Sequence, residues 1–251
     1  MRSVLRILGL VLTFAAIGCA PTPETPELPR NWLATVKVKV TLEIDGEAAV
    51  ASACGVVIWE DGLVLTNKHV VNDAKTIAVM HESAKSDLPA TVIATSDADL
   101  ALLRVAHRFP TAARIADAKD AKPGDPLYGV TVYGRVGKIV IRGAIARTHF
   151  TLGLGESSEE LKAAARRLDL DGDDVDVLLV DYAGSVGSSG SGLYRKRDDA
   201  LIGINSFSLL AAGSASESIF LRGVIPGYKI IKFLDTAKVP YHPARTKKRS
   251  F

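Results

Sequence analysis

The sequence predicts an all-β fold, and three observations lead to this prediction. The segment Thr35–Leu42 (TVKVKVTL) alternates apolar and polar residues, the period-two pattern of a half-buried strand. Short apolar segments separated by turn residues follow it along most of the chain. Helical patterns stand out only at Ser157–Leu168 and Pro226–Ala237. Many short strands with few helices are typical of a β-sandwich or a pair of β-barrels.

The other predicted strands are short and closely spaced. They are Ala53–Trp59, Leu63–Thr66, Thr76–Met80, Ala90–Thr95, Leu100–Val105, Pro126–Tyr133, Lys138–Ile145, Val175–Val180, Gly192–Arg195, Leu201–Phe207 and Ser218–Val224. The charged segment Ala113–Asp125, with Pro-Gly near its end, is expected to divide the globular part into two halves, each with its own strands.

Length, composition and charge are those of a globular protein with one large core or two modest ones. Of the 251 residues, 47% are hydrophobic. The formal net charge is +3, and two of these charges, Arg2 and Arg6, lie in a predicted leader, so the mature chain would carry only +1. This balance does not indicate nucleic-acid binding. The basic stretch Arg245–Ser250 (RTKKRS), within residues 241–251, is interpreted as a solvated tail rather than a docking patch for anionic lipid or nucleic acid.

The N-terminus has the features of an export signal. Arg2 and Arg6 precede the apolar run Ile7–Ile17, which is about half of the roughly 20 residues needed to span a bilayer, so residues 1–18 are predicted to be a cleaved signal peptide. The motif AAIGCAP resembles a bacterial lipoprotein signal that ends in a lipid-modified cysteine, here Cys19, although Ala16 stands where that pattern usually has Leu. The alternative is ordinary secretion with an incidental Cys19.

A proline-rich tether is predicted after this cysteine. Residues 19–31 contain APTPETPELPR, which favours extended polyproline geometry and cannot pack a core. The protein is therefore expected to be exported and anchored to the membrane of a bacterial cell envelope, on its periplasmic or extracellular face, through a lipid on Cys19. Cys54 is then left without a disulfide partner and is expected to be buried in a strand.

Three polar features in the apolar pattern indicate chemistry. His69 follows a predicted strand in DGLVLTNKHVVN, Asp97 and Asp99 precede a buried strand in SDADLALLRV, and Ser189 lies between glycines in YAGSVGSSGSG. A serine hydroxyl becomes a nucleophile when an imidazole takes its proton and a buried carboxylate orients that imidazole. The residue Gly187 would let two backbone N–H groups, its own and that of Ser189, point at a developing oxyanion.

These segments resemble the trypsin-like serine proteases, and among them the bacterial HtrA (Deg) branch. The resemblance rests on GVVIWEDGLVLTNKHVV, SDADLALLRV, GSSGSG and LIGINSF…SIFLRGVIPGYKIIKFL, in that order, and covers most of Thr35–Leu234. It implies two packed six-stranded β-barrels with a C-terminal helix and a short inserted helix. The implied domain spans residues 32–240, with the first barrel at about 32–112 and the second at about 122–236.

The same resemblance assigns roles to individual residues. The implied catalytic residues are His69, Asp99 and Ser189, with Asp97 as the second choice for the acid. The oxyanion hole falls on the amides of Gly187 and Ser189. The substrate pocket that the resemblance implies is formed by Ala183, as its floor, and by Asn205, Ser206, Phe207 and Ser208.

The sequence departs from the family pattern in three places. The nucleophile motif reads Gly-Ser-Ser-Gly-Ser, and Ser188 replaces the aspartate that digestive members use to pair with a cut N-terminus, so activation by propeptide cleavage is not expected. An insertion, Thr148–Asp174, carries the acidic run DLDGDDVD, whose spacing does not match a calcium loop; a solvated loop is expected, with no metal and no cofactor. The chain is expected to be a protease domain alone, without a peptide-binding PDZ domain.

The function predicted from these residues is that of a serine endopeptidase acting on protein or peptide substrates. The predicted pocket carries no charge, so cleavage after small or medium apolar residues is expected and cleavage after Lys or Arg is not, while the ring of Phe207 would set the upper size limit. Two alternatives are a catalytically silent pseudoprotease that binds peptides or partners in the cleft, and an esterase-like hydrolase with the same triad.

Overall fold

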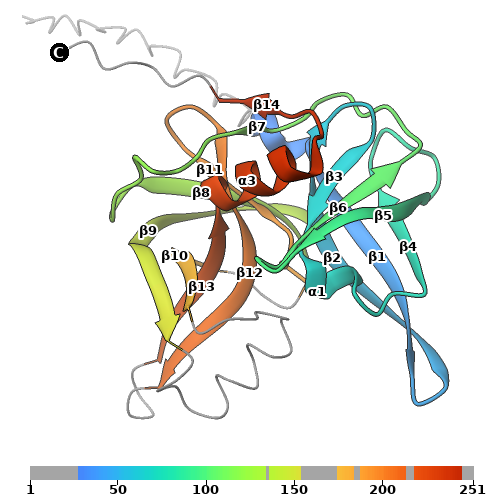
Figure 1. Ribbon diagram of the computed structural model, residues 1–251, viewed down its shortest axis with the longest axis horizontal. Helices are drawn as coiled ribbons and strands as arrows, with labels where there is room; N and C mark the ends of the chain where they lie inside the picture. The colour runs from blue at the N-terminus through green and yellow to red at the C-terminus, as the bar shows by residue number, and fades with distance from the viewer. Residues whose placement is uncertain (1–27, 134–135, 154–173, 184–186, 213–217, 245–251) are drawn as a thin grey trace, which may run out of the picture.

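The computed structural model describes residues 28–133, 136–153, 174–183, 187–212 and 218–244, which form two β-barrels side by side (Figure 1). The signal peptide, Cys19 and most of the tether lie outside the described residues, as do the predicted helix Ser157–Leu168 and the basic stretch Arg245–Ser250. Among the described helices, none is long and apolar enough to cross a membrane.

The first barrel has six antiparallel strands in the order β1-β2-β3-β6-β5-β4 and closes by pairing of β1 with β4. Its strands are β1 (Thr35–Ile44), β2 (Glu47–Trp59), β3 (Leu63–Thr66), β4 (Thr76–Met80), β5 (Leu88–Ser96) and β6 (Leu100–Val105). The alternation at the start of β1 has the predicted effect, because Val36, Val38 and Val40 are buried inside the barrel while Lys37 and Lys39 are not.

The second barrel is a ring of six strands in the order β11-β8-β9-β10-β13-β12, closed by pairing of β11 with β12. Its strands are β8 (Pro126–Tyr133), β9 (Gly137–Gly153), β10 (Asp174–Tyr182), β11 (Gly192–Arg195), β12 (Ala200–Ala212) and β13 (Ser218–Pro226). The short strands β7 (Arg114–Ile115) and β14 (His242–Pro243) extend this sheet beyond β12 by parallel pairing. The predicted all-β, two-barrel fold is confirmed.

The largest apolar cluster lies between the barrels. It joins side chains of the first barrel, such as Val56 and Leu65, to side chains of the second, such as Val130 and Ile204. β3, β6 and the inner half of β2 (Ala53–Ile58) are therefore largely buried on both faces, which is why their sequences read as nearly continuous apolar runs.

Helix α3 (Gly227–Ala237) covers this cluster (Figure 1). Ile230, Phe233 and Leu234 share one face of the helix at i, i+3 and i+4, and all three are buried in the inter-barrel cluster. The helix ends at Lys238, whose left-handed backbone (φ 54°) terminates it. The helix predicted at Pro226–Ala237 is confirmed, with Pro226 as its N-cap rather than its first residue.

Other boundaries differ from the prediction. β2 begins at Glu47 instead of Ala53, because β1 and β2 continue as a two-stranded hairpin beyond the barrel (Figure 1). The segment Ala113–Asp125 connects the barrels but is not a free linker: the Ala113 amide donates to the Val57 carbonyl in the first barrel and the Ala116 amide to the Leu201 carbonyl in the second. The fold also continues past residue 240, since β14 pairs with β7.

Candidate active site

His69 lies on α1 (Lys68–Val71), a single helical turn that begins directly after β3. The Asn67 side chain donates to the Asp99 carbonyl over 3.0 Å, and the His69 amide donates to Asp99 Oδ1 over 3.0 Å. His69 Nδ1 is 2.9 Å from both carboxylate oxygens of Asp99. The start of α1 and the turn before β6 are thus joined by hydrogen bonds that set the orientation of the imidazole.

The Asp99 carboxylate is fully buried, and its oxygens are satisfied by hydrogen bonds. Its side chain is 0% exposed. Beyond the three contacts to His69, it accepts a hydrogen bond from Ser206 Oγ over 2.5 Å. Asp99 has a left-handed backbone (φ 57°), a conformation that aspartate tolerates better than most residues. A buried carboxylate is costly unless such donors surround it, and here they do.

Asp97, the second choice for the acid, is not in contact with His69. Its side chain is 88% exposed and lies 3.9 Å from the Lys68 ammonium. Residues 97–99 form a turn and not the extended chain that the sequence suggested, so the two aspartates face different surroundings. The structure therefore brings Asp99, and not Asp97, to the histidine.

The loop that carries Ser189 requires glycine at two positions. Gly187 and Gly190 have φ of +93° and +80°, a region that residues with a side chain rarely adopt. A Cβ at Gly190 would lie 2.0 Å from the Cys54 carbonyl oxygen, so no side chain fits there. These constraints explain the two glycines that flank the serine in the sequence.

Both barrels hold this loop in place. From the first barrel, the Cys54 amide donates to the Ser189 carbonyl over 2.8 Å, and the Cys54 thiol donates to the Gly187 carbonyl over 3.3 Å. Burial raises the pKa of this thiol, which keeps it protonated as a donor. From the second barrel, the Asn205 side chain donates to the Ser188 carbonyl over 3.0 Å. Cys54 is buried as predicted, and it is a free cysteine.

Ser189 and His69 line the same cleft, whose volume is about 440 Å³. The Ser189 hydroxyl donates to the Ser206 carbonyl over 3.3 Å. Among the hydrogen bonds of the described residues, none joins Ser189 Oγ to His69 Nε2. For Ser189 to pass its proton to the imidazole, its hydroxyl must first leave Ser206.

The backbone amides of Gly187 and Ser189 donate no hydrogen bond to any described residue. The neighbouring amides are used, since Gly190 donates to the Asn205 carbonyl and Ser191 to the Ser188 carbonyl. Within the described part of the chain, the two amides that the sequence marked for an oxyanion hole therefore have no acceptor.

None of the five residues predicted to form the substrate pocket is among the residues that line this cleft. Ala183 is exposed and is not the floor of a buried pocket. The Asn205 side chain is turned under the Ser189 loop toward Ser188, and the Ser206 hydroxyl is turned toward Asp99. Ser208 is exposed and faces a cation.

The fifth residue, Phe207, is buried with its ring against the backbone of Gly223. A Cβ at Gly223 would lie 2.2 Å from the ring. Phe207 pairs with Gly223 across the β12–β13 ladder, so the ring occupies the space that the glycine leaves. The ring therefore belongs to the packing between β12 and β13.

Arg222 is a neighbour that the sequence did not indicate. It pairs with Ser208 across β12 and β13, and its guanidinium donates to Ser208 Oγ. Burial lowers the pKa of this arginine. The predicted pocket wall on β12 has no charged residue of its own. Arg222 on the neighbouring strand β13 places a positive charge beside Ser208, at the end of that wall.

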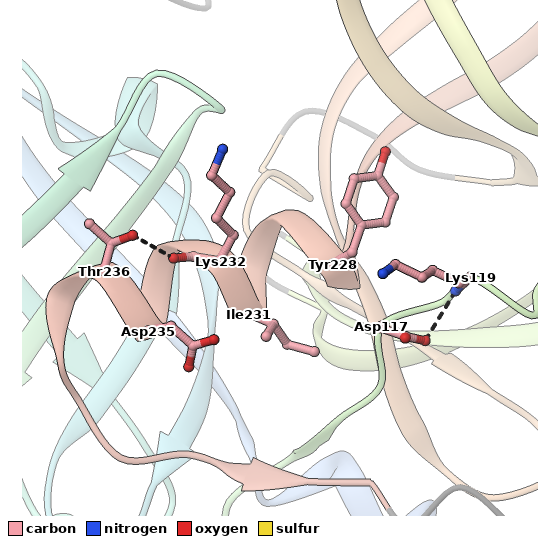
Figure 2. Close-up of a pocket in the computed structure, with 7 residues that line it drawn as sticks. All are labelled: Asp117, Lys119, Tyr228, Ile231, Lys232, Asp235 and Thr236. Atoms are coloured by element: carbon pink, nitrogen blue, oxygen red, sulfur yellow. Dashed lines mark hydrogen bonds between the residues drawn. The ribbon is translucent and has the colours of Figure 1, made fainter.

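A second hollow, of about 580 Å³, lies along α3 (Figure 2). Tyr228, Lys232 and Asp235 border it from the helix, and Asp117 and Lys119 from the segment after β7. It contains neither the serine nor the histidine, and its charges are of both signs. Among the described residues, no group of three or more His, Cys, Asp or Glu side chains is arranged to hold a metal ion. Most of the acidic run DLDGDDVD lies outside the described residues.

Sequence reasoning missed the supporting residues around the site. Ser206 contacts Asp99 from 107 positions away in the chain, and the Cys54 contacts span more than 130 positions. Because the partners are so far apart in the chain, neither contact produces a pattern that can be seen in a short stretch of sequence. Only the small residues around Ser189 are a visible signal, because their backbone conformations exclude side chains.

A family model and several known proteins match the sequence of this chain. The family model for the trypsin-like peptidase domain matches residues 53–204. The chain is 25% identical over 226 residues to serine protease HTRA1 of Xenopus tropicalis, with 84% of this chain and 44% of that protein covered. It is 26% identical over 190 residues to serine protease HTRA1A of Danio rerio (75% and 35% covered) and 28% identical over 182 residues to mitochondrial serine protease HTRA2 of Drosophila erecta (70% and 40% covered). The chain spans less than half the length of these relatives.

Proposed function

Since the chain belongs to the family of trypsin-like peptidases, we propose that it is a serine endopeptidase with Ser189 as nucleophile, His69 as general base and Asp99 as the acid that orients the base. The observation that carries the proposal is the 2.9 Å contact of His69 Nδ1 with the buried Asp99 carboxylate, beside a cleft that the same histidine shares with Ser189. This arrangement supports acyl transfer because each side chain has the neighbour that its role needs.

The chemistry follows from these contacts. The Asp99 carboxylate accepts a hydrogen bond from the Nδ1–H of His69, which fixes the tautomer and leaves the Nε2 lone pair free to accept a proton. Ser189 leaves the Ser206 carbonyl, gives its proton to Nε2 and attacks the peptide carbonyl carbon. The imidazolium that results is balanced by Asp99 and then protonates the leaving amine. Water, activated by the same histidine, cleaves the acyl-enzyme and regenerates Ser189.

The amides of Gly187 and Ser189 form the proposed oxyanion hole. The positive φ of Gly187 supports this role, as do the hydrogen bonds that hold the loop from both barrels. Preorganised N–H donors stabilise the negative charge that develops on the carbonyl oxygen in the transition state, where one donor is worth roughly 3–4 kcal/mol.

For the residue before the cleaved bond, the proposal is a small or medium apolar side chain, with Lys and Arg excluded. The first part is carried over from the family resemblance, in which an apolar side chain would gain about 25 cal/mol for each Å² that it buries. The second part is supported by the guanidinium of Arg222 at Ser208, which would repel a substrate cation.

The proposed location is the bacterial cell envelope, with the protein held at the membrane by a lipid on Cys19. The support is the leader pattern and the proline-rich tether in the sequence. Cys19→Ser should release the protein from the membrane fraction while leaving the domain folded. A wild-type protein that is wholly soluble and lacks a lipid mass at its N-terminus would contradict this part of the proposal.

A second candidate function is a pseudoprotease that binds peptides or partners in the cleft without cleaving them. One observation favours it: the Ser189 hydroxyl donates to the Ser206 carbonyl and not to His69. Catalytic hydrogen bonds are often formed only when substrate is bound, so this contact weighs less than the pairing of His69 with Asp99.

A fluorophosphonate probe distinguishes the two candidates, because it bonds covalently only to an activated serine. The purified wild-type domain should be labelled once, on Ser189, and Ser189→Ala should not be labelled. Cleavage of peptides, with esters as a comparison, would then separate an endopeptidase from an esterase. A folded wild-type domain that the probe leaves unlabelled would support the pseudoprotease and overturn the endopeptidase.

A further inference from the structure

Three successive carbonyl groups of the Ser189 loop each accept a hydrogen bond from one of two buried residues. The Gly187 carbonyl accepts from the Cys54 thiol over 3.3 Å, and the Ser189 carbonyl accepts from the Cys54 amide over 2.8 Å. Between them, the Ser188 carbonyl accepts from Asn205 Nδ2 over 3.0 Å. Cys54 belongs to β2 of the first barrel and Asn205 to β12 of the second. The loop is thus held from both barrels at consecutive peptide units.

The direction of the Ser188 carbonyl fixes the direction of the next amide. In a trans peptide the C=O and the N–H point in opposite directions, and no described peptide bond is cis. The Ser188 carbonyl points at the buried Asn205 side chain, so the Ser189 N–H points away from it, toward the cleft that Ser189 lines. This N–H is one of the two donors of the proposed oxyanion hole. Asn205 therefore sets the direction of a donor that acts on the transition state.

The Asn205 side chain directs its hydrogen bonds to Ser188 alone. Its Nδ2 group donates to the Ser188 carbonyl and, over 3.1 Å, to Ser188 Oγ. Its Oδ1 atom is buried without a hydrogen-bond partner in the described part of the chain. An unpaired amide oxygen in a core costs free energy, and an apolar residue at this position, which is 1% exposed, would avoid that cost. The contact of Nδ2 with the Ser189 loop explains why asparagine is present.

The Cys54 thiol has one proton, and its neighbours direct that proton to Gly187. The Val132 amide can only donate, and it lies 3.2 Å from the sulfur. In the described sheet β11 pairs with β8 only as far as Val130, so the sulfur takes the place of a strand acceptor. The Gly187 carbonyl can only accept, so the thiol donates to it and the Thr131 hydroxyl, 3.4 Å away, donates to the sulfur. The residue that carries the second oxyanion donor is thereby anchored to both barrels.

We propose that Cys54 and Asn205 are positioning residues for the oxyanion hole, which hold the loop so that the amides of Gly187 and Ser189 stay directed at the oxygen of the scissile carbonyl. This inference rests on the proposed endopeptidase function. Neither side chain lines the cleft, so both act through the loop and not on the substrate. Catalysis then depends on the docking of the two barrels, because one residue comes from β2 and the other from β12.

The test compares alanine variants that remove these contacts with one that does not. Cys54→Ala and Asn205→Ala each delete a side-chain donor to the loop, and Cys54→Ser keeps a donor in the same place. Val56→Ala is the matched control, because Val56 is fully buried two residues along β2 on the same face and its side chain cannot donate to the loop.

Each protein is assayed with a peptide substrate and with a peptidyl trifluoromethyl ketone that has Leu before the ketone. The Ser189 hydroxyl adds to the ketone carbon and forms a hemiketal whose oxygen occupies the proposed oxyanion hole. The pKa of this hemiketal, followed by ¹⁹F NMR, reports on the two amide donors, because donors that are well directed stabilise its ionised form. Urea unfolding measures the stability of each variant.

Cys54→Ala and Asn205→Ala should lower kcat on the order of ten- to a hundredfold, which is part of the roughly 10²–10³-fold that a whole oxyanion donor contributes. The KM should stay within about twofold, since the oxyanion forms only in the transition state. The hemiketal should ionise about one to two pH units higher than in the wild type, which is the same factor expressed as a pKa. Cys54→Ser should recover most of the kcat. Val56→Ala should lose stability but keep the wild-type kcat and hemiketal pKa.

Two results would overturn the inference. One is the same hemiketal pKa in the wild type, Cys54→Ala and Asn205→Ala. The other is a loss of kcat in Val56→Ala as large as that in Cys54→Ala, because the effect would then follow core packing alone. If Asn205→Ala does not fold, the comparison of Cys54→Ala with Cys54→Ser and Val56→Ala decides the question.

Failure of the proposed function gives a different result. If the wild type cleaves no peptide and the fluorophosphonate probe leaves Ser189 unlabelled, the endopeptidase proposal fails and this inference fails with it. If the wild type is active and the variants ionise the hemiketal as the wild type does, the inference alone is overturned.

Discussion

Ser206 donates its hydroxyl hydrogen bond to Asp99 Oδ2 over 2.5 Å, while its carbonyl accepts one from Ser189 Oγ over 3.3 Å. One residue of β12 therefore touches both the proposed acid and the proposed nucleophile. The first contact holds the carboxylate in place, and the second holds the serine away from the imidazole. Ser206 is best described as a positioning residue.

Removal of the Ser206 hydroxyl should reduce catalysis without abolishing it. Ser206→Ala leaves the buried Asp99 carboxylate with one donor fewer, which should cost about 1–3 kcal/mol of stability and lower kcat about tenfold or more. The KM should change little. Urea unfolding and steady-state kinetics measure the two effects.

Two further variants separate positioning from a general loss of packing. Ser206→Thr keeps the hydroxyl and should recover most of the kcat. Ser208→Ala removes an exposed hydroxyl two residues along the same strand and should leave kcat near the wild-type value. If Ser206→Ala and Ser208→Ala lose equal activity, the contact with Asp99 has no part in catalysis.

The two aspartates before β6 should differ strongly in their effect on activity. Asp99→Asn removes the charge that orients and balances His69 and should lower kcat on the order of 10⁴-fold. Asp97→Asn changes a side chain that is 88% exposed and should leave kcat within about twofold. Ser189→Ala gives the lower limit, on the order of a million-fold below the wild type. A large loss in Asp97→Asn with normal activity in Asp99→Asn would move the acid to Asp97.

Two glycines with the same backbone conformation separate backbone strain from close packing in the Ser189 loop. Gly190 and Gly124 have φ of +80° and +87°, but a Cβ meets the Cys54 carbonyl oxygen at 2.0 Å in the first and nothing within 4 Å in the second. Gly124→Ala should cost about 1–2 kcal/mol, which is the strain alone.

Gly190→Ala should cost several kcal/mol more than Gly124→Ala, because the Ser189 loop must move away from β2. It should also lose labelling of Ser189 by the fluorophosphonate probe. Thermal unfolding and labelling are both measurable on the purified domain. Equal unfolding temperatures for the two variants would show that the loop has room for a side chain.

His81 should make the domain less stable in mild acid. Burial lowers the pKa of this histidine below its usual value of 6.5, and the nearby charges of Lys138 and His107 add to the effect. The hydrogen bond to the Leu33 carbonyl and the charge of Glu82 oppose it. The neutral ring donates from Nε2 to the Leu33 carbonyl over 2.8 Å and accepts at Nδ1 from the Ser83 amide over 3.0 Å. Protonation of Nδ1 would remove that acceptor.

The lowered pKa of His81 makes the folded domain less stable as the pH falls. Because the folded state binds this proton less readily than the unfolded chain, its contribution to stability is complete above pH 6.5 and declines as the pH falls from there toward the lowered pKa of the folded state. Urea unfolding between pH 8 and pH 5 should show this decline, and His81→Gln should remove part of it. An identical pH dependence in both proteins would contradict the assignment to His81.

The sequence was sufficient to predict the elements that carry a strong local pattern. Alternation in β1 and the i, i+3, i+4 spacing of Ile230, Phe233 and Leu234 are set by the element's own geometry. Helix α1 and strands β7 and β14 were missed because they are four residues long or shorter and depend on tertiary partners.

At the site, the sequence indicated the positions that only one type of residue can fill. It did not indicate which way the side chains on β12 point. Glycines at positive φ and an acid before a buried strand stand out locally. Asn205 and Ser206 were expected to face a pocket, but β12 has an irregular register between Asn205 and Phe207. The Asn205 side chain instead donates a hydrogen bond to Ser188, and the Ser206 hydroxyl donates one to Asp99. No local pattern predicts such a bulge.

The last prediction concerns the residue before the cleaved bond. Desolvation of a Lys or Arg side chain is costly without a carboxylate, and Arg222 against Ser208 adds repulsion, whereas an apolar side chain gains about 25 cal/mol per Å². A peptide library should therefore show Ala, Val or Leu before the cut and little cleavage after Lys or Arg. Arg222→Gln should weaken the discrimination against Lys and Arg, and Arg142→Gln, which changes an exposed arginine on β9, should leave it unchanged. A library dominated by Asp or Glu in the wild type would contradict the apolar preference, because it would mean that the Arg222 guanidinium leaves Ser208 and binds the substrate carboxylate.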